Sequence, residues 1–396
     1  MGSTSLIPKQ AAIAVGDLVD NCANVQPGQQ VLILACPDGL HGGINIVDEE
    51  TVAWIQATVQ QRGADAHVLW ADIPPRPSLL WGQGADPNKS WRVPTVVKNA
   101  ILGADVLINH VADLTYEEEL REMPDILEEC NVPMVRNMAT TASLLTSNWG
   151  LTPYELVSEI RVQAAALVQE GAKWTMTHPN GSHLEGIVVG PAEGDHYAHY
   201  RTIGLYRPFP EGVLPSMRSR DAEGMAIIKE IGVIWSRHIG VPCPFKEPVR
   251  VHVENGYIKK FEGGDEAETL TRFYKFIADF LGEAAYEVRG FHGGVHPSAI
   301  LEPHQCPNQP YRHFIEHHHW SSFHFHMGNS RSTKGFPYLM HIPGELRGGT
   351  LKVGDNYLYK KGRLASMDHP AVRAIAERYP DRPGLEPESW LQVPRG

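Results

Sequence analysis

The stretch 248-PVRVHVENGYIKKFE-262 predicts a β-hairpin and marks the point where the fold changes character. Two runs of alternating side chains flank Asn255-Gly256, a dipeptide that favours the type I′ turn between adjacent antiparallel strands. Residues 173–189 repeat the pattern, with two strands predicted around 180-NGSH-183. The second half of the chain is therefore expected to be rich in antiparallel strands.

Toward the N-terminus, short apolar runs alternate with helical patterns. Strands are predicted at 30–36, 65–70, 105–111 and 132–137, and helices at 47–61, 94–102, 116–130 and 153–169. This βαβα order predicts a mostly parallel sheet covered by helices. We therefore expect an α/β domain over residues 1–170, followed by a β-rich α+β domain over residues 171–396 that carries the functional site.

The composition is that of an ordinary globular protein. The chain has 396 residues, of which 42% are hydrophobic and 20% are charged, with a net charge of −11. No run of Lys and Arg could follow a phosphate backbone, so no nucleic-acid partner is expected. No segment has the roughly 18 consecutive apolar residues of a membrane span, and 1-MGSTSLIPKQ-10 lacks the apolar core of a secretory signal. These absences predict a cytoplasmic protein with no membrane contact.

The cysteines are few and stand far apart. None is part of a CxxC pair, which argues against both a disulfide framework and a structural zinc knot. We expect five reduced, mostly buried thiols: Cys22, Cys36, Cys130, Cys243 and Cys306.

Histidines are concentrated in one segment. Ten of the chain's 20 histidines lie between His292 and His341, and 317-HHHWSSFHFHMG-328 alone contains five. On a strand, alternate side chains share a face, so His324 and His326 are expected to lie together. Three consecutive histidines cannot all point at one atom, so most of 317–319 should have other roles.

Two further motifs supply histidines from separate loops. These are 290-GFHGGVHP-297, with His292 and His296, and 338-YLMHIPGE-345, with His341. Ligands drawn from several loops are typical of a catalytic metal site that keeps open positions for substrate. We predict one metal ion held by His292, His324 and His341. His326 and His296 are predicted to face the substrate or to replace a ligand.

The order of motifs resembles a known family. 180-NGSH-183, 207-RPFPEG-212, the hairpin, 286-YEVRGFHGGVHP-297 and 341-HIPGELRGGTLKVGD-355 follow one another as in the C-terminal half of the aminopeptidase T family of metallopeptidases. The resemblance is closer to the branch that contains 2,5-dihydroxypyridine 5,6-dioxygenase, a non-haem iron enzyme that opens a hydroxylated pyridine ring. It covers about residues 175–364, with a weaker α/β similarity before them.

The resemblance also shows where this chain departs from the family. The dioxygenase branch has an iron-binding histidine at the position of Gly290 and a His-x-Asp pair at the positions of Leu339 and His341. The aminopeptidases have a ligand histidine at the position of His324. Because His292 lies two residues beyond Gly290, on the same strand face, the resemblance implies a metal site moved by one pleat and rebuilt from histidines. A two-metal peptidase needs bridging carboxylates that are replaced here, so peptide cleavage is disfavoured.

The proposed cofactor is Fe(II), with Zn²⁺ or Mn²⁺ as alternatives. Three neutral imidazoles leave the full double charge on the ion, which favours an anionic, chelating substrate. The predicted function is an extradiol-type ring-cleaving dioxygenase that uses O₂ and a hydroxylated aromatic or N-heteroaromatic acid, in a homo-oligomer. The alternatives are a zinc-dependent hydrolase or decarboxylase, an aminopeptidase T-like metallopeptidase, and a metal-binding scaffold without catalysis.

Candidate acid–base residues lie in and near two turns. His183, His196 and His199 could move a proton to or from a ring hydroxyl, because histidine titrates near working pH. Glu185, two residues from His183, could orient that histidine or bind substrate. The alternative for all of them is a solvated surface position.

Two arginines are candidates for binding a substrate carboxylate. Arg201 and Arg289 are chosen because a guanidinium group can bind a carboxylate through two parallel hydrogen bonds. Arginines near loops are usually solvated, which is the alternative role for both.

Overall fold

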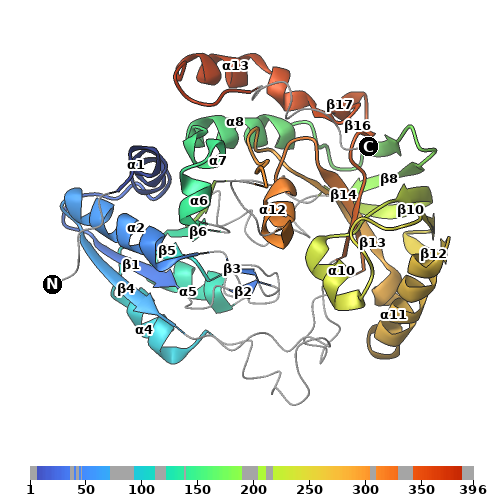
Figure 1. Cartoon of the computed structure of the whole chain (residues 1–396), viewed down its shortest axis with the longest axis horizontal. Helices are drawn as coiled ribbons and strands as arrows, with labels where there is room; N and C mark the ends of the chain where they lie inside the picture. The colour runs from blue at the N-terminus through green and yellow to red at the C-terminus, as the bar shows by residue number, and fades with distance from the viewer. Residues whose placement is uncertain are drawn as a thin grey trace.

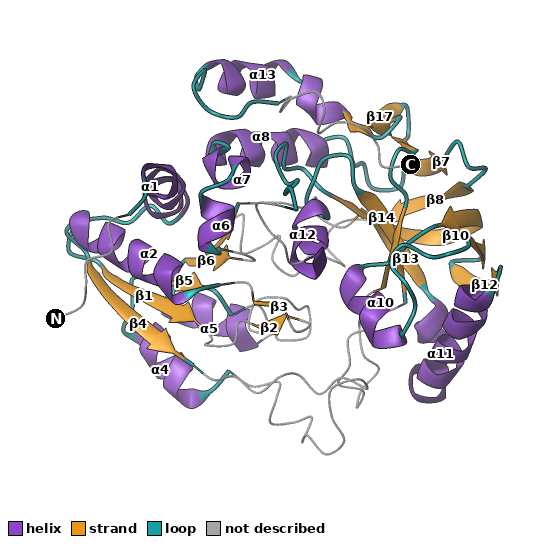
Figure 2. Ribbon diagram, in the orientation of Figure 1, coloured by secondary structure: helices purple, strands orange, loops and turns teal. Residues whose placement is uncertain are grey.

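The structure is a computed structural model that describes residues 7–35, 40–41, 44–45, 47–71, 93–111, 122–137, 140–189, 204–210, 217–303, 309–328 and 342–385. Two sheets dominate it, a parallel one built mainly from the N-terminal part and a large antiparallel one built from the later part (Figures 1 and 2). The expected fold class is therefore confirmed.

The first sheet has five parallel strands. Their order is β4 (Asp65–Trp70), β1 (Gln30–Ala35), β5 (Val106–Asn109), β6 (Met134–Asn137) and β9 (Tyr206–Phe209). The helices of this part are α1 (Lys9–Gly16), the π-helical turn η1 (Asp17–Cys22), α2 (Glu49–Gln61), α4 (Thr95–Leu102), α5 (Glu122–Cys130), α6 (Ala142–Leu145), α7 (Asn148–Leu151) and α8 (Tyr154–Ala165).

Local sequence explains how helix α2 begins and which face it buries. Asp48 caps the helix, because its Oδ1 accepts a hydrogen bond of 3.0 Å from the Thr51 amide. Its Oδ2 accepts a second one of 2.8 Å from the Ala142 amide, which ties α2 to α6. Val52, Ile55 and Val59 follow at helical spacing and are buried against the sheet.

The second sheet has eleven strands, and neighbouring strands in it run antiparallel. The main order is β15 (Ile342–Glu345), β14 (Phe323–Met327), β13 (Val288–Gly293), β10 (Met217–Ile228), β8 (His183–Val189), β7 (Lys173–Thr177), β16 (Thr350–Val353), β17 (Asn356–Lys360) and β18 (Arg363–Leu364). Strand β11 (Val249–Glu254) pairs with β10 and with β12 (Tyr257–Glu262). The remaining elements are β2 (Leu40–His41), β3 (Ile44–Asn45), α10 (Val233–Ile239), α11 (Asp265–Leu281), η4 (Gly282–Tyr286), α12 (Gln309–Glu316), η5 (Ala365–Asp368) and α13 (Pro370–Glu377).

The predicted hairpin is confirmed as β11 and β12. Asn255 and Gly256 at its tip have φ values of 51° and 79°, as a type I′ turn requires. Helix α11 covers the hairpin with one apolar face, and the Tyr274 ring lies 4.8 Å from the ring of Phe261. This packing fixes the far side of the sheet that carries the histidines.

The later part of the chain contributes residues to the first sheet and to its core. After leaving the first part of the chain, the backbone returns at β9 to extend the parallel sheet next to β6. Ala299, Leu301, Tyr311 and Ile315, from the segment between β13 and β14, also join the core around α1 and α2. The division at residue 170 stays a prediction, although β9 and residues between β13 and β14 contribute to the first sheet and its core. Among the described helices, none is both long and apolar enough to cross a membrane.

Candidate metal centre

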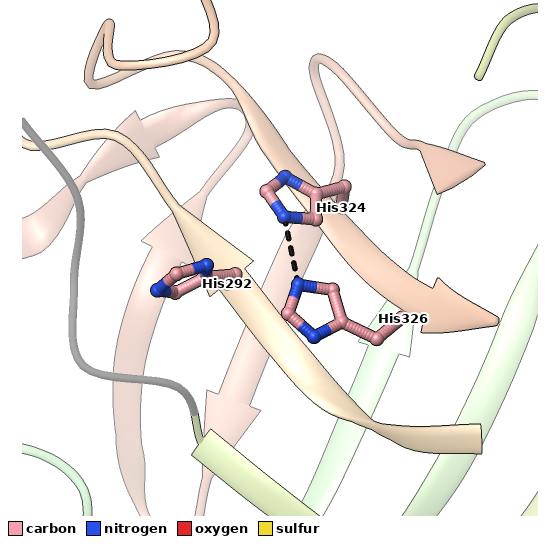
Figure 3. Close-up of side chains that lie close together, drawn as sticks. All are labelled: His292, His324 and His326. Atoms are coloured by element: carbon pink, nitrogen blue, oxygen red, sulfur yellow. Dashed lines mark hydrogen bonds between the residues drawn. The ribbon is translucent and has the colours of Figure 1, made fainter. Parts of the chain in front are cut away.

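Pairing of three neighbouring strands places His292, His324 and Glu345 in one row. His292 of β13 is opposite His324 of β14, which in turn is opposite Glu345 of β15. Side chains directly opposite each other in antiparallel strands point to the same face of a sheet, and His326 is two residues from His324 on that face. Figure 3 shows the three imidazoles turned toward one another.

The ring nitrogens of this group are close together. The Nε2 atoms of His324 and His326 are 3.1 Å apart, and one nitrogen from each of His292, His324 and His326 lies within 4.8 Å of the others. His324 is fully buried and His326 is 8% exposed. The prediction that His324 and His326 share a face is confirmed, and His326 now stands where a ligand would.

These distances fit a bound cation. Two nitrogens that each lie about 2.1 Å from one ion, at right angles, are about 3.0 Å apart. The two Nε2 atoms already have nearly that separation. Without an ion, one of these rings must carry its proton on Nε2 to avoid facing two lone pairs. The residues present therefore suit a transition-metal ion with nitrogen ligands.

The geometry at Gly290 excludes the histidine that the resemblance implies at this position. A Cβ atom at this position would lie 1.9 Å from the carbonyl oxygen of Met217 on β10, and the φ of Gly290 is 152°. The pairing of β13 with β14 also shifts register between Val288 and Phe291. This strand geometry leaves no space for a histidine at 290, whereas His292 reaches the same face two residues later.

A buried carboxylate lies beside the histidines. Glu345 Oε1 is 2.8 Å from His317 Nδ1, and Glu345 Oε2 accepts a hydrogen bond of 3.1 Å from Ser322. Burial opposes ionisation, but His317 and Arg347 outweigh it and lower the pKa of Glu345 to about 2. Glu345 is therefore a permanent negative charge next to the site.

Glu345, His317 and His324 form a second donor group, within 4.8 Å of one another. The His317 ring stacks on His324, with centroids 4.0 Å apart. Because a neutral imidazole has a single unprotonated nitrogen, His324 can serve only one ion at a time. The two groups are therefore alternative parts of one centre.

Glu345 is not among the site residues predicted from the sequence, although it belongs to the motif 338-YLMHIPGE-345. Glu345 is 21 residues from His324 along the chain, and only the pairing of β14 with β15 brings them together. The one available signal was a glutamate in a short, otherwise apolar strand, 342-IPGE-345. A charged residue there needs a buried partner.

Several predicted site residues lie outside the described part of the chain. These are His341, His196, His199 and Arg201, together with the side chain of Arg289, whose backbone belongs to β13. Their roles as ligand, acid–base residues and carboxylate partners stay predictions.

The other predicted residues are described but lie apart from the histidine group. His183 is exposed and pairs with Met225, eight residues along β10 from the Met217 that faces Phe291, which is about 25 Å on a strand. Glu185 forms an ion pair of 2.9 Å with Lys173. His296 is fully buried and stacks on Trp149 at 5.5 Å. Burial holds its pKa well below the usual value, so it is neutral. Their roles also stay predictions.

A parallel sheet with helices, followed by a large antiparallel sheet, defines a class of fold seen in solved structures of different activity. The chain resembles 2,5-dihydroxypyridine dioxygenase from Pseudomonas putida KT2440, with a TM-score of 0.63 and 16% identity over 90% of this chain and 98% of that one. It also resembles AmpT from Thermus thermophilus, with a TM-score of 0.50 and 11% identity over 90% of this chain and 99% of that one. At such identities the likeness shows the fold alone.

The sequence identifies the family to which the chain belongs. The family model for 2,5-dihydroxypyridine 5,6-dioxygenase matches residues 19–366, and the chain belongs to this family. No curated protein matches it. The family is one of ring-cleaving dioxygenases, so the chain is assigned to an enzyme family that uses O₂ and an aromatic substrate.

Proposed function

We propose that the protein is a mononuclear Fe(II) dioxygenase that opens the ring of a hydroxylated aromatic or N-heteroaromatic acid. The observation that carries this proposal is the group of His292, His324 and His326, in which His324 is fully buried and two Nε2 atoms are 3.1 Å apart, in a member of a dioxygenase family. His341 is proposed as a further ligand. When bound, Fe(II) would supply the redox chemistry that lets O₂ react with the ring.

His317 and Glu345 are proposed to handle the substrate proton. Glu345 Oε1 lies 2.8 Å from His317 Nδ1, so a neutral His317 would keep its proton on Nδ1 and present an unprotonated Nε2. That nitrogen can take the proton of a ring hydroxyl, which makes the substrate anionic and better suited to a divalent cation. Glu345 then stabilises the positive charge that forms on His317. His324 and His326, both on β14, are 0% and 8% exposed, which limits the contact of their rings with bulk water.

A zinc-dependent hydrolase or decarboxylase is the second candidate, because three imidazoles can also hold Zn²⁺ and a water molecule. Metal analysis of anaerobically purified protein, combined with oxygen uptake on a panel of hydroxylated pyridines and phenols, separates the two. We expect iron, and consumption of O₂ in proportion to substrate. Turnover that continues without oxygen, or a product that carries no label from ¹⁸O₂, would assign the protein to the second candidate.

Ligand variants test the centre itself. His292→Ala, His324→Ala and His326→Ala should each weaken metal affinity at least about 100-fold, since even groups that only support a ligand typically contribute 10- to 100-fold. His341→Ala tests the remaining proposed ligand. The exposed His67 of β4 offers a matched control, and His67→Ala should keep its metal. Full metal content in the His324→Ala protein would refute the centre.

A further inference from the structure

A group of three different donors lies beside His292, His324 and His326, which are called the histidine centre from here on. Glu230, Cys243 and His313 each offer an atom within 4.8 Å of the other two. His313 Nε2 is 3.4 Å from Glu230 Oε2 and 3.9 Å from Cys243 Sγ. The side chains of His313 and Glu230 are only 13% and 20% exposed. A carboxylate, a thiol and an imidazole thus converge from three separate segments.

The backbone holds these segments in place. Glu230 follows β10, and its carbonyl accepts a hydrogen bond of 3.2 Å from the Glu345 amide. Cys243 lies in the loop after α10, which is closed by a hydrogen bond of 2.7 Å from the Phe245 amide to the Lys229 carbonyl. His313 belongs to α12, which contacts α10 (Figure 1). The donors therefore converge through the fold and need no rearrangement of the chain.

The charges around this group favour a cation. Glu230 Oε1 is 3.3 Å from Arg347 Nε, and Arg347 Nη1 is 3.9 Å from Glu316, so a single guanidinium serves two carboxylates. Glu230 Oε2 is turned toward His313. A carboxylate with one oxygen held by another group and one oxygen available is the usual arrangement of a metal ligand supported by its surroundings.

We propose that Glu230, Cys243 and His313 form a second metal site, for Zn²⁺ or an ion of similar chemistry. All three groups are zinc ligands, and a sulfur ligand disfavours Mg²⁺ and Ca²⁺. Burial opposes protonation of His313, but Cys243 and Glu230 outweigh it and raise the pKa of His313 to about 10, so the free imidazole is protonated. Binding therefore forms sulfur–metal and nitrogen–metal bonds while the thiol proton of Cys243 and the Nε2 proton of His313 pass to solvent. The proposal of this site does not rest on the proposed dioxygenase function.

The distances need little adjustment. With metal–ligand distances of about 2.0 Å for nitrogen and oxygen and 2.3 Å for sulfur, tetrahedral ligands lie about 3.3 Å apart for N···O and about 3.5 Å for N···S. The structure has 3.4 Å and 3.9 Å. The ion would fasten α12 to the end of β10. Because His317 follows α12 directly, occupancy of this site would also help to position the histidine centre.

Cobalt provides the first test, because a thiolate bound to Co²⁺ gives a charge-transfer absorption that imidazole and carboxylate ligands do not. Metal-free, full-length protein titrated with Co²⁺ should develop this band and saturate it at about one equivalent of thiolate-bound ion. Cys243→Ala should abolish the band. Cys130→Ala, which removes another half-buried thiol, should retain it. His324→Ala should also retain it, which separates this site from the histidine centre.

Thiol protection provides a second test that needs no variant. Saturating Zn²⁺ should slow alkylation of Cys243 by iodoacetamide at least about tenfold, measured peptide by peptide in the wild-type protein, and leave Cys130 unchanged. If Co²⁺ gives no thiolate band and Zn²⁺ leaves Cys243 labelling unaltered, the group is only an ion pair between Glu230 and His313 and the proposal is wrong.

Discussion

Glu345 is the residue whose environment most constrains the chemistry of the centre. It is 4% exposed, permanently charged, and hydrogen-bonded on one oxygen to Ser322 while the other faces His317. A buried carboxylate of this kind is costly unless its partners remain, so it should act through them. Its proposed partner in catalysis is His317, since the pair has the geometry by which a carboxylate sets an imidazole tautomer.

Glu345→Gln keeps the shape of the side chain and removes its charge. We expect kcat for ring cleavage to fall about 100-fold with metal content unchanged, because His317 loses the acceptor that fixes its tautomer. His317→Ala should give a similar fall, and the double variant should be no slower than either single one, since the two residues act as a unit. The exposed carboxylate of Glu283 provides the control variant Glu283→Gln. Loss of metal in Glu345→Gln would instead make Glu345 a ligand.

His110, at the end of β5, should make the protein sensitive to acid. It is 1% exposed, its Nδ1 is 2.8 Å from Thr140 Oγ1, and burial lowers its pKa to about 3. The unfolded chain binds this proton near pH 6.5 and the folded one does not. The stabilisation is therefore present above pH 6.5 and is lost as the pH falls toward 3, by about 2 kcal/mol at pH 5.

The variant His110→Asn tests this, because an amide can keep the contact with Thr140 but does not titrate. In urea unfolding of metal-free protein, its loss of stability between pH 7 and pH 5 should be smaller than that of the wild type by about 2 kcal/mol. The exposed His67→Asn should keep the wild-type difference. An unchanged pH dependence in His110→Asn would show that His110 is not the group responsible.

At the scale of elements, the position of the site depends on how β13 lies between β10 and β14. The close approach at Gly290 lets β10 and β13 pair, and beyond the register shift between Val288 and Phe291 the pairing places His292 opposite His324. The strand therefore excludes a ligand at one position and supplies it at another. A substitution at Gly290 should disturb pairing before it affects chemistry.

Gly290→Ala is expected to lower the free energy of unfolding by about 3 kcal/mol or more, because both its φ and the Met217 carbonyl oxygen oppose a side chain. Gly290→His should do at least as much damage and should not restore a family-type centre. Gly103 is the control: its φ is −96° and an added Cβ would meet its nearest atom at 3.7 Å, so Gly103→Ala should change stability by less than about 1 kcal/mol. Denaturant midpoints measure both, and a stable Gly290→Ala protein would contradict this account.

Local sequence predicted most of these elements and part of the centre. The strand 65–70, the hairpin at Asn255-Gly256 and the shared face of His324 and His326 all follow from periodicity and turn chemistry. Strand β9 was not predicted because Pro208 weakens the sequence pattern of a strand. Proline is tolerated there because β9 is an edge strand. Glu345 and the Glu230–Cys243–His313 group were not predicted as site residues. Their positions depend on contacts between segments that are distant in the sequence, which periodicity does not encode.

At the scale of the whole molecule, contacts join the N-terminal part of the chain to the later part. Arg207, at β9, donates a hydrogen bond of 2.9 Å to the Ala23 carbonyl, and Asp17 forms an ion pair with Arg382 near the far end of the described chain. The core of the N-terminal part includes Tyr311 and Ile315, which belong to α12. Since α12 also leads to His317, the packing that completes the first core holds the histidine centre in place.

A fragment of residues 1–170 should therefore not fold as a native domain. It would lack β9, which leaves β6 as an unpaired edge, and it would expose the apolar surface that Ala299, Leu301 and Tyr311 cover. We expect the fragment to keep helical far-UV circular dichroism, to bind the dye ANS, and to lack a cooperative calorimetric transition, whereas the full chain unfolds cooperatively. Mixing it with residues 171–396 should restore some of the transition if the parts recognise each other. A sharp transition in the isolated fragment, with the enthalpy per residue of the full chain, would instead establish an independent domain ending at residue 170.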